Sequence, residues 1–339
     1  MIKVLVTGAG GGVGQGIIKS LKMINDLEIK IIAADMNVKA AGLYSGDIAC
    51  LVQACNADDY LESLGRIFER ELVEYYFPGT DVELGFCAKN KNIIFEKFGV
   101  RTVISSPEAV NIADNKYNTY LFLKENGFSY PKTMWADNVN FSDLKYPLIV
   151  KPAVGCRSIG VFEVNNKNDL MKCITGGEYL LIQELVGDLE SEYTCTVVKV
   201  CSEISPVLAL RRVLRSGDTF RAEPVKNLVI EKYIHDVAMK LDIEGGCNFQ
   251  LRLDHMGVPK IFEINCRFSG TTPFCAQLGF NPVEFYLKKR LSLDYQPHID
   301  YDSYILRYWS EVIVKKAVIN NLSIHGRSDI GVNKQFSLF

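Results

Sequence analysis

The chain has few of the residues and patterns that mark several protein classes. Its four histidines and ten cysteines include no C-x-x-C pair and no His-rich segment, so the sequence offers no zinc cluster. Its 38 basic and 40 acidic residues leave a formal net charge of −2, which provides no general basic field. No apolar run approaches membrane-spanning length. These absences leave no argument for a nucleic-acid or a membrane partner.

Cysteine usage and the N-terminal residues indicate the cellular compartment. Several cysteines lie in apolar runs typical of small core residues, and a reducing, cytoplasmic location is the simplest account. The opening MIKVLVTGAGG enters a strand and a glycine loop directly, without the apolar stretch and cleavage site of a signal peptide, so we expect no secretion. With 339 residues, 48% hydrophobic and 23% charged, the chain is expected to form two or three globular domains.

The first hundred residues alternate between strand and helix patterns. Apolar runs at 2–6, 29–34, 75–77 and 101–104 predict strands, and helical spacing at 14–23 predicts a crossover helix. This alternation predicts a parallel α/β sheet. Later β-rich runs at 179–185 and 304–314 predict further strands, and 193–213 predicts two antiparallel strands.

Two polar strands late in the chain form the strongest candidate site. The runs NFQLRLD at 248–254 and IFEINCRF at 261–268 are rich in strand formers, with a short turn at 255–257 between them. If they pair as a hairpin, Gln250 lies opposite Glu263.

Alternation along the second strand decides which of its side chains share a face. Glu263, Asn265 and Arg267 are expected on one face, and Phe262 and Ile264 on the core face. Carboxylate and amide oxygens are ligands for Mg²⁺, and a guanidinium can hold the anion that the cation bridges. The hairpin therefore predicts a site for Mg²⁺ and phosphate, with an ordinary hairpin carrying a solvated polar face as the alternative.

A lysine and a glycine loop predict a second phosphate contact. Lys151 ends the apolar run 147–150, and the loop GCRSIG at 155–160 follows. A lysine at a strand end can neutralise a phosphate, and glycines let backbone N–H groups approach its oxygens closely. A surface lysine beside a simple hairpin is the alternative.

The segment LLIQELVG at 180–187 predicts contacts to a nucleoside. A strand that stops at 184–186 can present backbone donors and acceptors to an adenine edge, and Glu192 beyond it can accept hydrogen bonds from ribose hydroxyls. A strand exit with solvated acids is the alternative.

The N-terminal glycine loop supports a rival function. Gly8, Gly11 and Gly14 follow a strand and precede a helix, and Asp35 ends the next strand where a ribose-binding acid is expected. This pattern is typical of dinucleotide binding. A tight turn that binds no dinucleotide is the alternative that we favour.

A tyrosine and a lysine extend this rival reading. Tyr120 and Lys124 have the Y-x-x-x-K spacing of short-chain dehydrogenases, with Ser105 and Ser106 upstream, which would make the chain an NAD(P)-dependent epimerase. Such i, i+4 pairs also arise by chance on helices, and the remaining two hundred residues would have no role.

The order of these segments resembles the ATP-grasp superfamily, most closely its carbamoyl-phosphate-synthase-like carboxylate–amine ligases. The resemblance covers about residues 1–295. It implies a Rossmann-like pre-ATP-grasp domain at 1–110 and an ATP-grasp fold at 111–295, in which two α+β subdomains clamp ATP and the lid subdomain spans about 130–185. A C-terminal extension at 296–339 is expected to pack on the grasp domain.

The resemblance assigns a role to each candidate residue. The implied metal ligands are Gln250, Glu263 and Asn265, and the implied catalytic residues are Arg267 and Lys151. The implied nucleotide-binding residues are Lys116, Lys151, Gly155, Arg157, Ser158, Gly160, Glu184, Leu185, Val186 and Glu192. Many ATP-grasp enzymes have an acid where this chain has Gln250, so metal affinity is expected to be lower at that corner, although the carbamoyl-phosphate branch tolerates glutamine there.

The resemblance also implies a reaction. ATP phosphorylates a small-molecule carboxylate, and an amine or ammonia attacks the acyl phosphate with release of ADP and phosphate. The implied cofactors are ATP and two Mg²⁺ ions, with Mn²⁺ able to substitute, and the loop 155–160 is expected to close over the intermediate. A homodimer is left open. A regulatory protein that binds ATP without turnover is a third alternative.

Four arginines give one indication of substrate charge. The group at 211–221 could receive an anionic substrate or could form a solvated strand surface. Its members are Arg211, Arg212, Arg215 and Arg221.

Overall fold

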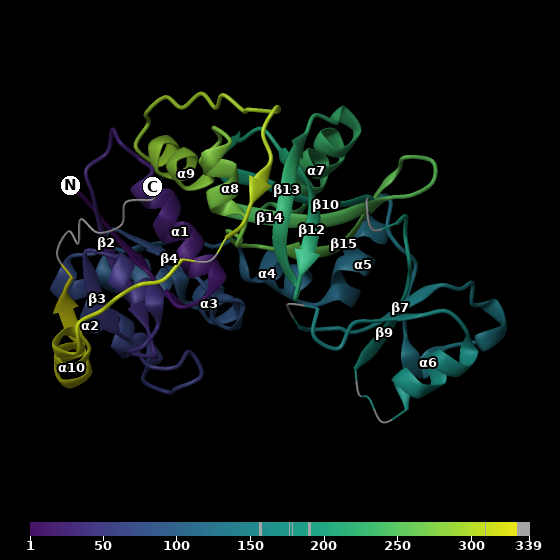
Figure 1. The fold of residues 1–339 in the computed structure, drawn as a ribbon, viewed down its shortest axis with the longest axis horizontal. Helices are drawn as coiled ribbons and strands as arrows, with labels where there is room; N and C mark the ends of the chain where they lie inside the picture. Colours follow the sequence, from purple (N-terminus) through teal and green to yellow (C-terminus); the bar gives the residue numbers. More distant parts are fainter. Residues whose placement is uncertain (156–157, 176, 178, 189–190, 309, 331–339) are drawn as a thin grey trace.

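The computed structural model describes residues 1–155, 158–175, 177, 179–188, 191–308 and 310–330, within which the chain forms three β-sheets (Figure 1). The sheets follow one another along the longest axis of the molecule, with the N-terminal sheet at one end and the smallest sheet at the other. This architecture confirms the predicted α/β class, a Rossmann-like layer followed by two α+β units.

The N-terminal sheet has the strand order β17-β3-β2-β1-β4-β5, and its first five strands in sequence are parallel. These strands are β1 (Ile2–Val6), β2 (Ile29–Asp35), β3 (Ile48–Leu51), β4 (Tyr75–Phe77) and β5 (Arg101–Thr102). The helices between them are α1 (Gly12–Lys22), η1 (Ala41–Ser45), α2 (Tyr60–Glu71) and α3 (Asp81–Phe98). The sequence predicted all of these strands except β3.

Both faces of the N-terminal sheet are buried. Leu5 and Ile32 pack into one hydrophobic core with residues of α2 and α3, whereas Val4 and Ile31 pack into another with residues of α1. Alternate residues of one strand thus enter different cores, which explains why the strands read as continuous apolar runs.

The second sheet is antiparallel and has the order β15-β14-β10-β12-β13-β16, with β11 paired to β10. Its strands are β10 (Glu192–Val200), β11 (Glu203–Ile204), β12 (Leu208–Arg215), β13 (Asp218–Val225), β14 (Gly245–Leu253), β15 (Pro259–Asn265) and β16 (Ile305–Leu306). Its helices are α4 (Pro107–Asp114), α5 (Lys116–Glu125), α7 (Leu228–Leu241), α8 (Thr272–Gln277) and α9 (Pro282–Arg290). The predicted antiparallel pair at 193–213 is confirmed as β10 and β12, while the strand predicted at 304–314 is wrong beyond the two residues of β16.

The third sheet is small and has its own core. Its order is β6-β9-β7-β8, and Leu148, Val150, Leu170 and Ile182 are buried together under it. Its elements are β6 (Thr133–Trp135), η2 (Ala136–Asn138), η3 (Phe141–Asp143), β7 (Leu148–Pro152), β8 (Phe162–Val164), α6 (Lys167–Ile174) and β9 (Leu180–Glu184). This unit lies within the span predicted for the lid subdomain.

The C-terminal segment connects two of the sheets. β16 pairs with β13 in the second sheet, and after α10 (Lys316–His325) the strand β17 (Arg327–Asp329) pairs antiparallel with β3 in the first. The predicted packing of residues 296–339 on the ATP-grasp domain therefore describes only β16, because β17 joins the N-terminal sheet. The domain boundaries at residues 110 and 295 stay predictions. Among the helices of the described residues, none has the length and apolarity needed to span a bilayer.

Candidate active site

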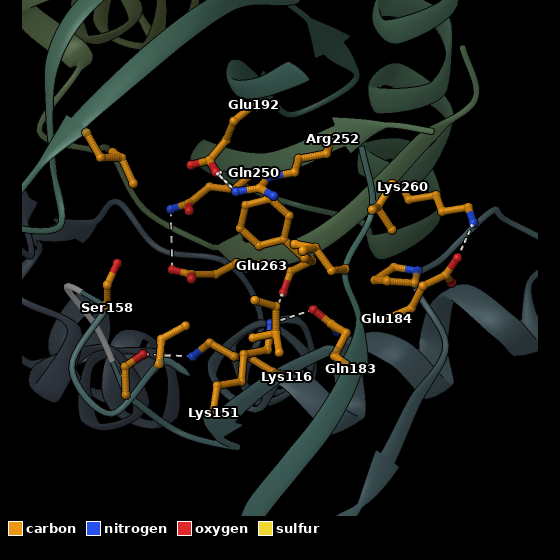
Figure 2. Close-up of a pocket in the computed structure, with 18 of the residues that line it drawn as sticks. Lys116, Lys151, Ser158, Gln183, Glu184, Glu192, Gln250, Arg252, Lys260 and Glu263 are labelled. Atoms are coloured by element: carbon orange, nitrogen blue, oxygen red, sulfur yellow. Dashed lines mark hydrogen bonds and ion pairs between the residues drawn. The ribbon is translucent and has the colours of Figure 1, made fainter. Parts of the chain in front are cut away.

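A cavity of about 900 Å³ opens between the small sheet and the second sheet (Figure 2). We call it the first cavity. Ten of the predicted site residues line it, and they come from both sheets, from α5 and from the segments that follow β7 and β9. They are Lys116, Lys151, Gly155, Ser158, Glu184, Leu185, Val186, Glu192, Gln250 and Glu263.

Three predicted residues lie elsewhere, and a fourth falls outside the described residues. Asn265 and Gly160 are absent from the lining of this cavity, and Arg267 lines a second cavity beside it. Arg157 lies outside the described residues, as does its neighbour Cys156.

Lys151 is a buried cation without a counter-charge. It projects from β7, and its Nζ donates to Gln183 Oε1 at 2.8 Å and to the Phe262 carbonyl at 3.2 Å. No ion pair to a carboxylate is formed within the described part of the chain. Burial, together with the positive charges of Lys116 and Arg252, lowers the pKa of Lys151 to about 7 against the opposing effect of Glu263. A phosphate entering the cavity would supply the missing anion.

Lys116 lies where α5 meets the start of the loop at 155–160. The Asn115 side chain caps α5 by accepting from the Tyr117 N–H, which fixes Lys116 as the first residue of the helix. Lys116 is buried, and its Nζ donates to the Gly155 carbonyl at 2.8 Å. The start of the loop, a lysine and a helix N-terminus therefore adjoin one another, an arrangement suited to an anion.

The strand exit at 184–186 lies against the second sheet. Glu184 ends β9, accepts a hydrogen bond from the Lys132 N–H, and pairs with Lys260 at 3.3 Å. Leu185 and Val186 continue the wall of the first cavity. The position predicted for an adenine edge is thus part of the cavity, and its role stays a prediction.

The hairpin of β14 and β15 forms as predicted but contains a β-bulge. Gln250 pairs with Glu263, whereas the next residue, Leu251, pairs with Ile261, so Phe262 is an extra residue on its strand. Phe262 consequently faces the first cavity next to Glu263, and its ring centroid lies 5.5 Å from Lys151 Nζ. The prediction that Phe262 faces the core is wrong, because alternation assumes an uninterrupted ladder. Ile264 is buried in the core as predicted.

Glu263 is the centre of the predicted metal corner. Its Oε1 accepts from Asn265 Nδ2 at 3.0 Å and from Gln250 Nε2 at 3.3 Å, so the three predicted ligands lie together. The described residues contain no group of three His, Cys, Asp or Glu side chains placed to share a metal ion. The two amides turn their nitrogens to Glu263 and their oxygens to Arg212 and Arg267, so the carboxylate is the oxygen ligand that this corner presents to Mg²⁺.

Glu192 is held by two arginines. Its Oε1 accepts from Arg212 Nη2 at 2.8 Å and its Oε2 accepts from Arg252 Nη2 at 2.8 Å, and the carboxylate is buried. Both carboxylate oxygens of Glu192 therefore already accept hydrogen bonds within the protein. The contact to a ribose stays a prediction, and it would use a second lone pair on one of these oxygens.

Arg267 connects the second sheet to the N-terminal unit. Its Nε pairs with Asp81 Oδ1 at 2.5 Å, and its Nη2 donates to Asn265 Oδ1 at 3.1 Å. Asp81 is the first residue of α3, whose start is fixed by a capping box between Thr80 and Glu83. The predicted catalytic arginine thus already has a carboxylate partner from the other domain.

A second cavity of about 1180 Å³ lies between the N-terminal glycine loop, at Gly11 and Gly12, and the second sheet. Gly11, Gly12 and Asp81 line its N-terminal side, and Arg267 and Arg307 its other side. Both cavities are lined by Ile159, Arg212, Gln250 and Glu263. The two cavities therefore meet at the metal corner, where groups bound in each could react.

The predicted arginine group does not form one surface. Arg211 pairs with Glu223, and Arg215 and Arg221 lie near the ring of Phe220. Successive residues of β12 face opposite sides of the sheet, so only Arg212 of these four lines the cavities.

The residues that suggested a dinucleotide-binding site have interaction partners inside the protein. Asp35 accepts hydrogen bonds from the Gly10 N–H at 2.8 Å and from the Asn37 N–H at 2.9 Å. Tyr120 and Lys124 lie together on α5, with Lys124 Nζ 5.7 Å from the tyrosine ring, and neither lines either cavity. The geometry therefore gives Asp35 a role in the glycine turn itself.

Several lining residues were missed by the sequence analysis. Arg252 could have been found, because it lies two residues after Gln250 on the same strand and so shares its face. The others depend on contacts between distant strands or on the bulge. The missed residues are Gln183, Arg252, Lys260, Phe262 and Arg307.

Two parts of the chain match known protein families. Residues 113–271 match the family described as ATP-grasp domain, and residues 4–104 match the family described as PylC-like, N-terminal domain. Carbamoyl phosphate synthase large chain from Thermoanaerobacter sp. (strain X514) is 26% identical over 323 residues, which covers 85% of this chain and 29% of that protein. The same protein from Thermoplasma acidophilum is 23% identical over 296 residues, covering 74% and 28%. The chain thus spans less than a third of the length of these relatives.

Solved structures show the same fold at low sequence identity. N5-carboxyaminoimidazole synthetase from Staphylococcus aureus complexed with ADP matches with a TM-score of 0.71 and 15% identity, covering 89% of this chain and 80% of that one. Biotin carboxylase from Campylobacter jejuni in a β,γ-ATP complex has a TM-score of 0.68 and 17% identity, covering 89% and 74%. L-amino acid ligase from Bacillus licheniformis has a TM-score of 0.66 and 14% identity, covering 86% and 74%. None of these proteins is a dehydrogenase or an epimerase, so the rival reading gains no support.

Proposed function

Residues 113–271 belong to the ATP-grasp family, and from this premise we propose that the chain is an ATP-dependent ligase joining a small-molecule carboxylate to an amine or ammonia. The carboxylate is first phosphorylated, and the resulting acyl phosphate is attacked by the nitrogen nucleophile, with release of ADP and phosphate. The observation that carries this proposal is the meeting of the two cavities at Glu263.

In this proposal the first cavity holds ATP. Lys151 and Lys116 face the phosphates, where a phosphate oxygen would give Lys151 the counter-charge that it lacks. The ring of Phe262 offers a surface for stacking by the purine, beside the strand exit at 184–186. The described residues of the loop at 155–160 that line this cavity, Gly155, Ser158 and Ile159, would lie beside the phosphates.

Mg²⁺ would be held chiefly by the Glu263 carboxylate, because the amide oxygens of the other two predicted ligands, Gln250 and Asn265, accept from Arg212 and Arg267. The ion would neutralise charge on the γ-phosphate, so that a substrate carboxylate can approach it. Arg267 lies 3.1 Å from Asn265 and faces the second cavity, where it can orient that carboxylate. No side-chain nucleophile is required, because the reaction depends on positioning and charge screening.

The second cavity is the proposed binding place of the acceptor substrate. Arg307 lines it, donates to the Gly270 carbonyl at 2.7 Å, and forms no ion pair within the described residues. The start of α1 at Gly12, whose N-cap residue Gly11 provides no side-chain cap, adds a partial positive charge. An anionic substrate fits this environment. A cytoplasmic location and a homodimer stay predictions.

ADP release measured against a panel of carboxylates and amines tests the proposal. We expect turnover that requires both substrates and Mg²⁺, and we expect Glu263→Ala to abolish it. Glu96→Ala, which removes an exposed carboxylate on α3, should leave turnover unchanged. Binding of ATP without turnover for any pair would favour the regulatory alternative. Binding of NAD(P) in place of ATP would overturn the proposal.

A further inference from the structure

Arg212 is a buried cation at the point where the two cavities meet. It projects from β12, its side chain is 8% exposed, and it lines both cavities. Its Nη2 donates to Glu192 Oε1 at 2.8 Å and to Gln250 Oε1 at 2.7 Å, and its Nε donates to Glu192 Oε1 at 3.1 Å. The guanidinium is therefore fixed beside Gln250, one of the predicted metal ligands.

The contacts of Gln250 determine which way its amide faces. Oε1 accepts from Arg212, while Nε2 donates to Glu263 Oε1 at 3.3 Å. The opposite orientation would bring two donors together at Arg212 and two acceptors together at Glu263. The amide oxygen that would ligate a cation is therefore the atom bonded to the guanidinium. A divalent ion on it would lie next to a fixed positive charge.

The carboxylates at the corner provide charge for one divalent ion. Glu263 forms no ion pair within the described residues, whereas Glu192 is neutralised by Arg212 and Arg252. Asn265, on the other side of Glu263, also has its amide oxygen bonded to an arginine, Arg267. Two divalent ions would share a single carboxylate between two guanidinium groups.

We propose that Arg212 takes the place of one divalent cation, so that this chain binds its nucleotide with a single metal ion at Glu263. The inference rests on the proposed function, and it replaces the two ions expected from the family resemblance. Arg212 then supplies permanent positive charge between the phosphates and the acceptor carboxylate, which a second ion would otherwise supply. A glutamine at position 250 is suited to this arrangement because it can accept from a guanidinium without adding a charge.

Counting bound Mn²⁺ tests the proposal without any acceptor substrate. The protein is dialysed to equilibrium against Mn²⁺ and a non-hydrolysable β,γ-imido analogue of ATP, and the metal and nucleotide bound per chain are measured. We expect one Mn²⁺ and one nucleotide. Two Mn²⁺ ions with one nucleotide would overturn this inference and leave the proposed function standing. Failure to bind the nucleotide would overturn the proposed function itself.

A paired substitution gives an independent readout. Arg212→Met combined with Gln250→Glu removes the guanidinium and adds a carboxylate, and we expect it to bind a second Mn²⁺ per nucleotide. Arg211→Met is the matched control, because Arg211 is the neighbouring arginine and pairs with Glu223 away from both cavities. The control should still bind one Mn²⁺. If the double variant does not fold, the count for the unaltered chain decides alone.

Discussion

Raising the pH above neutrality should weaken nucleotide binding, because Lys151 loses its charge near pH 7. Burial lowers the pKa of Lys151 to about 7, and the nearby charges of Lys116 and Arg252 act in the same direction. The two groups that accept from its Nζ, Gln183 and the Phe262 carbonyl, are neutral. A bound phosphate would restore the charged form, so binding should be accompanied by proton uptake.

The size of the effect follows from proton linkage. If the pKa of Lys151 in the nucleotide complex is about 10.5 or higher, as for an unperturbed lysine, the apparent Kd should rise about 50-fold between pH 7 and pH 9. The rise then approaches tenfold per pH unit. Proton uptake per nucleotide should increase from about one half at pH 7 to about one at pH 9, because half of the Lys151 side chains are already protonated at pH 7.

The stability of the free protein should change in the opposite direction. The pKa of Lys151 in the folded chain, about 7, lies below the ordinary lysine value of 10.5, so the unfolded chain binds more protons at this position between these values. The contribution of Lys151 to the free energy of unfolding is therefore constant below pH 7 and rises as the pH increases through this window. A general loss of structure at alkaline pH would instead lower stability and affinity together.

Calorimetry in buffers of different ionisation enthalpy, at pH 7, 8 and 9, measures both Kd and proton uptake. Lys151→Met should bind the nucleotide analogue more weakly at pH 7 and should lose the dependence on pH, while its melting temperature is retained or raised. Lys145→Met serves as the control, because Lys145 is exposed and lies in the loop before β7. This variant should keep the dependence of Kd on pH. A Kd that does not change between pH 7 and 9, or a Lys151→Met variant with the original slope, would refute the reasoning.

Two other predictions concern Phe262, which the sequence analysis placed on the core face, and Glu83, a buried acid of the N-terminal unit. Phe262→Ala should weaken nucleotide binding by about 1–3 kcal/mol, the usual range for a base stacked on an aromatic ring, in a titration where exposed Phe95→Ala has no effect. Glu83→Ala should lower the free energy of unfolding by about 3–5 kcal/mol in urea, because it leaves the Thr7, Tyr60 and Tyr76 hydroxyls without their buried acceptor. A loss below about 1 kcal/mol would show that these hydroxyls find other partners.

The N-terminal sheet could be predicted because its strands are buried on both faces. Runs such as 2–6 and 29–34 are continuously apolar, and glycine-rich or helical segments separate them. The missed strand, β3, has four residues and lies next to an acid, Asp47, whose Oδ2 accepts from the Ile31 N–H of β2. Its place in the sheet depends on this contact, which joins residues 16 apart in the sequence.

The hairpin site could be predicted up to the point where its ladder is irregular. The pairing of Gln250 with Glu263 follows from the turn and the two strand patterns. The bulge at Phe262 does not, because regular alternation carries no signal for an inserted residue. The network from Glu192 through Arg212 to Gln250 joins three strands, and its members are separated by 20 and 38 residues in sequence. Only the register of the whole sheet brings them together.

The glycine loop that suggested a dinucleotide site has a structural explanation. Gly8 has a φ of +56°, and a Cβ there would overlap the side chain of Thr80, while a Cβ on Gly14 would overlap the Gly8 carbonyl. Buried Glu83 holds the facing turn by accepting from the Gly79 and Thr80 N–H groups. The glycine spacing is thus required by close packing between two loops of the N-terminal sheet. Because the same turn leads into Asp81, which pairs with Arg267, this packing also sets the position of the arginine at the metal corner.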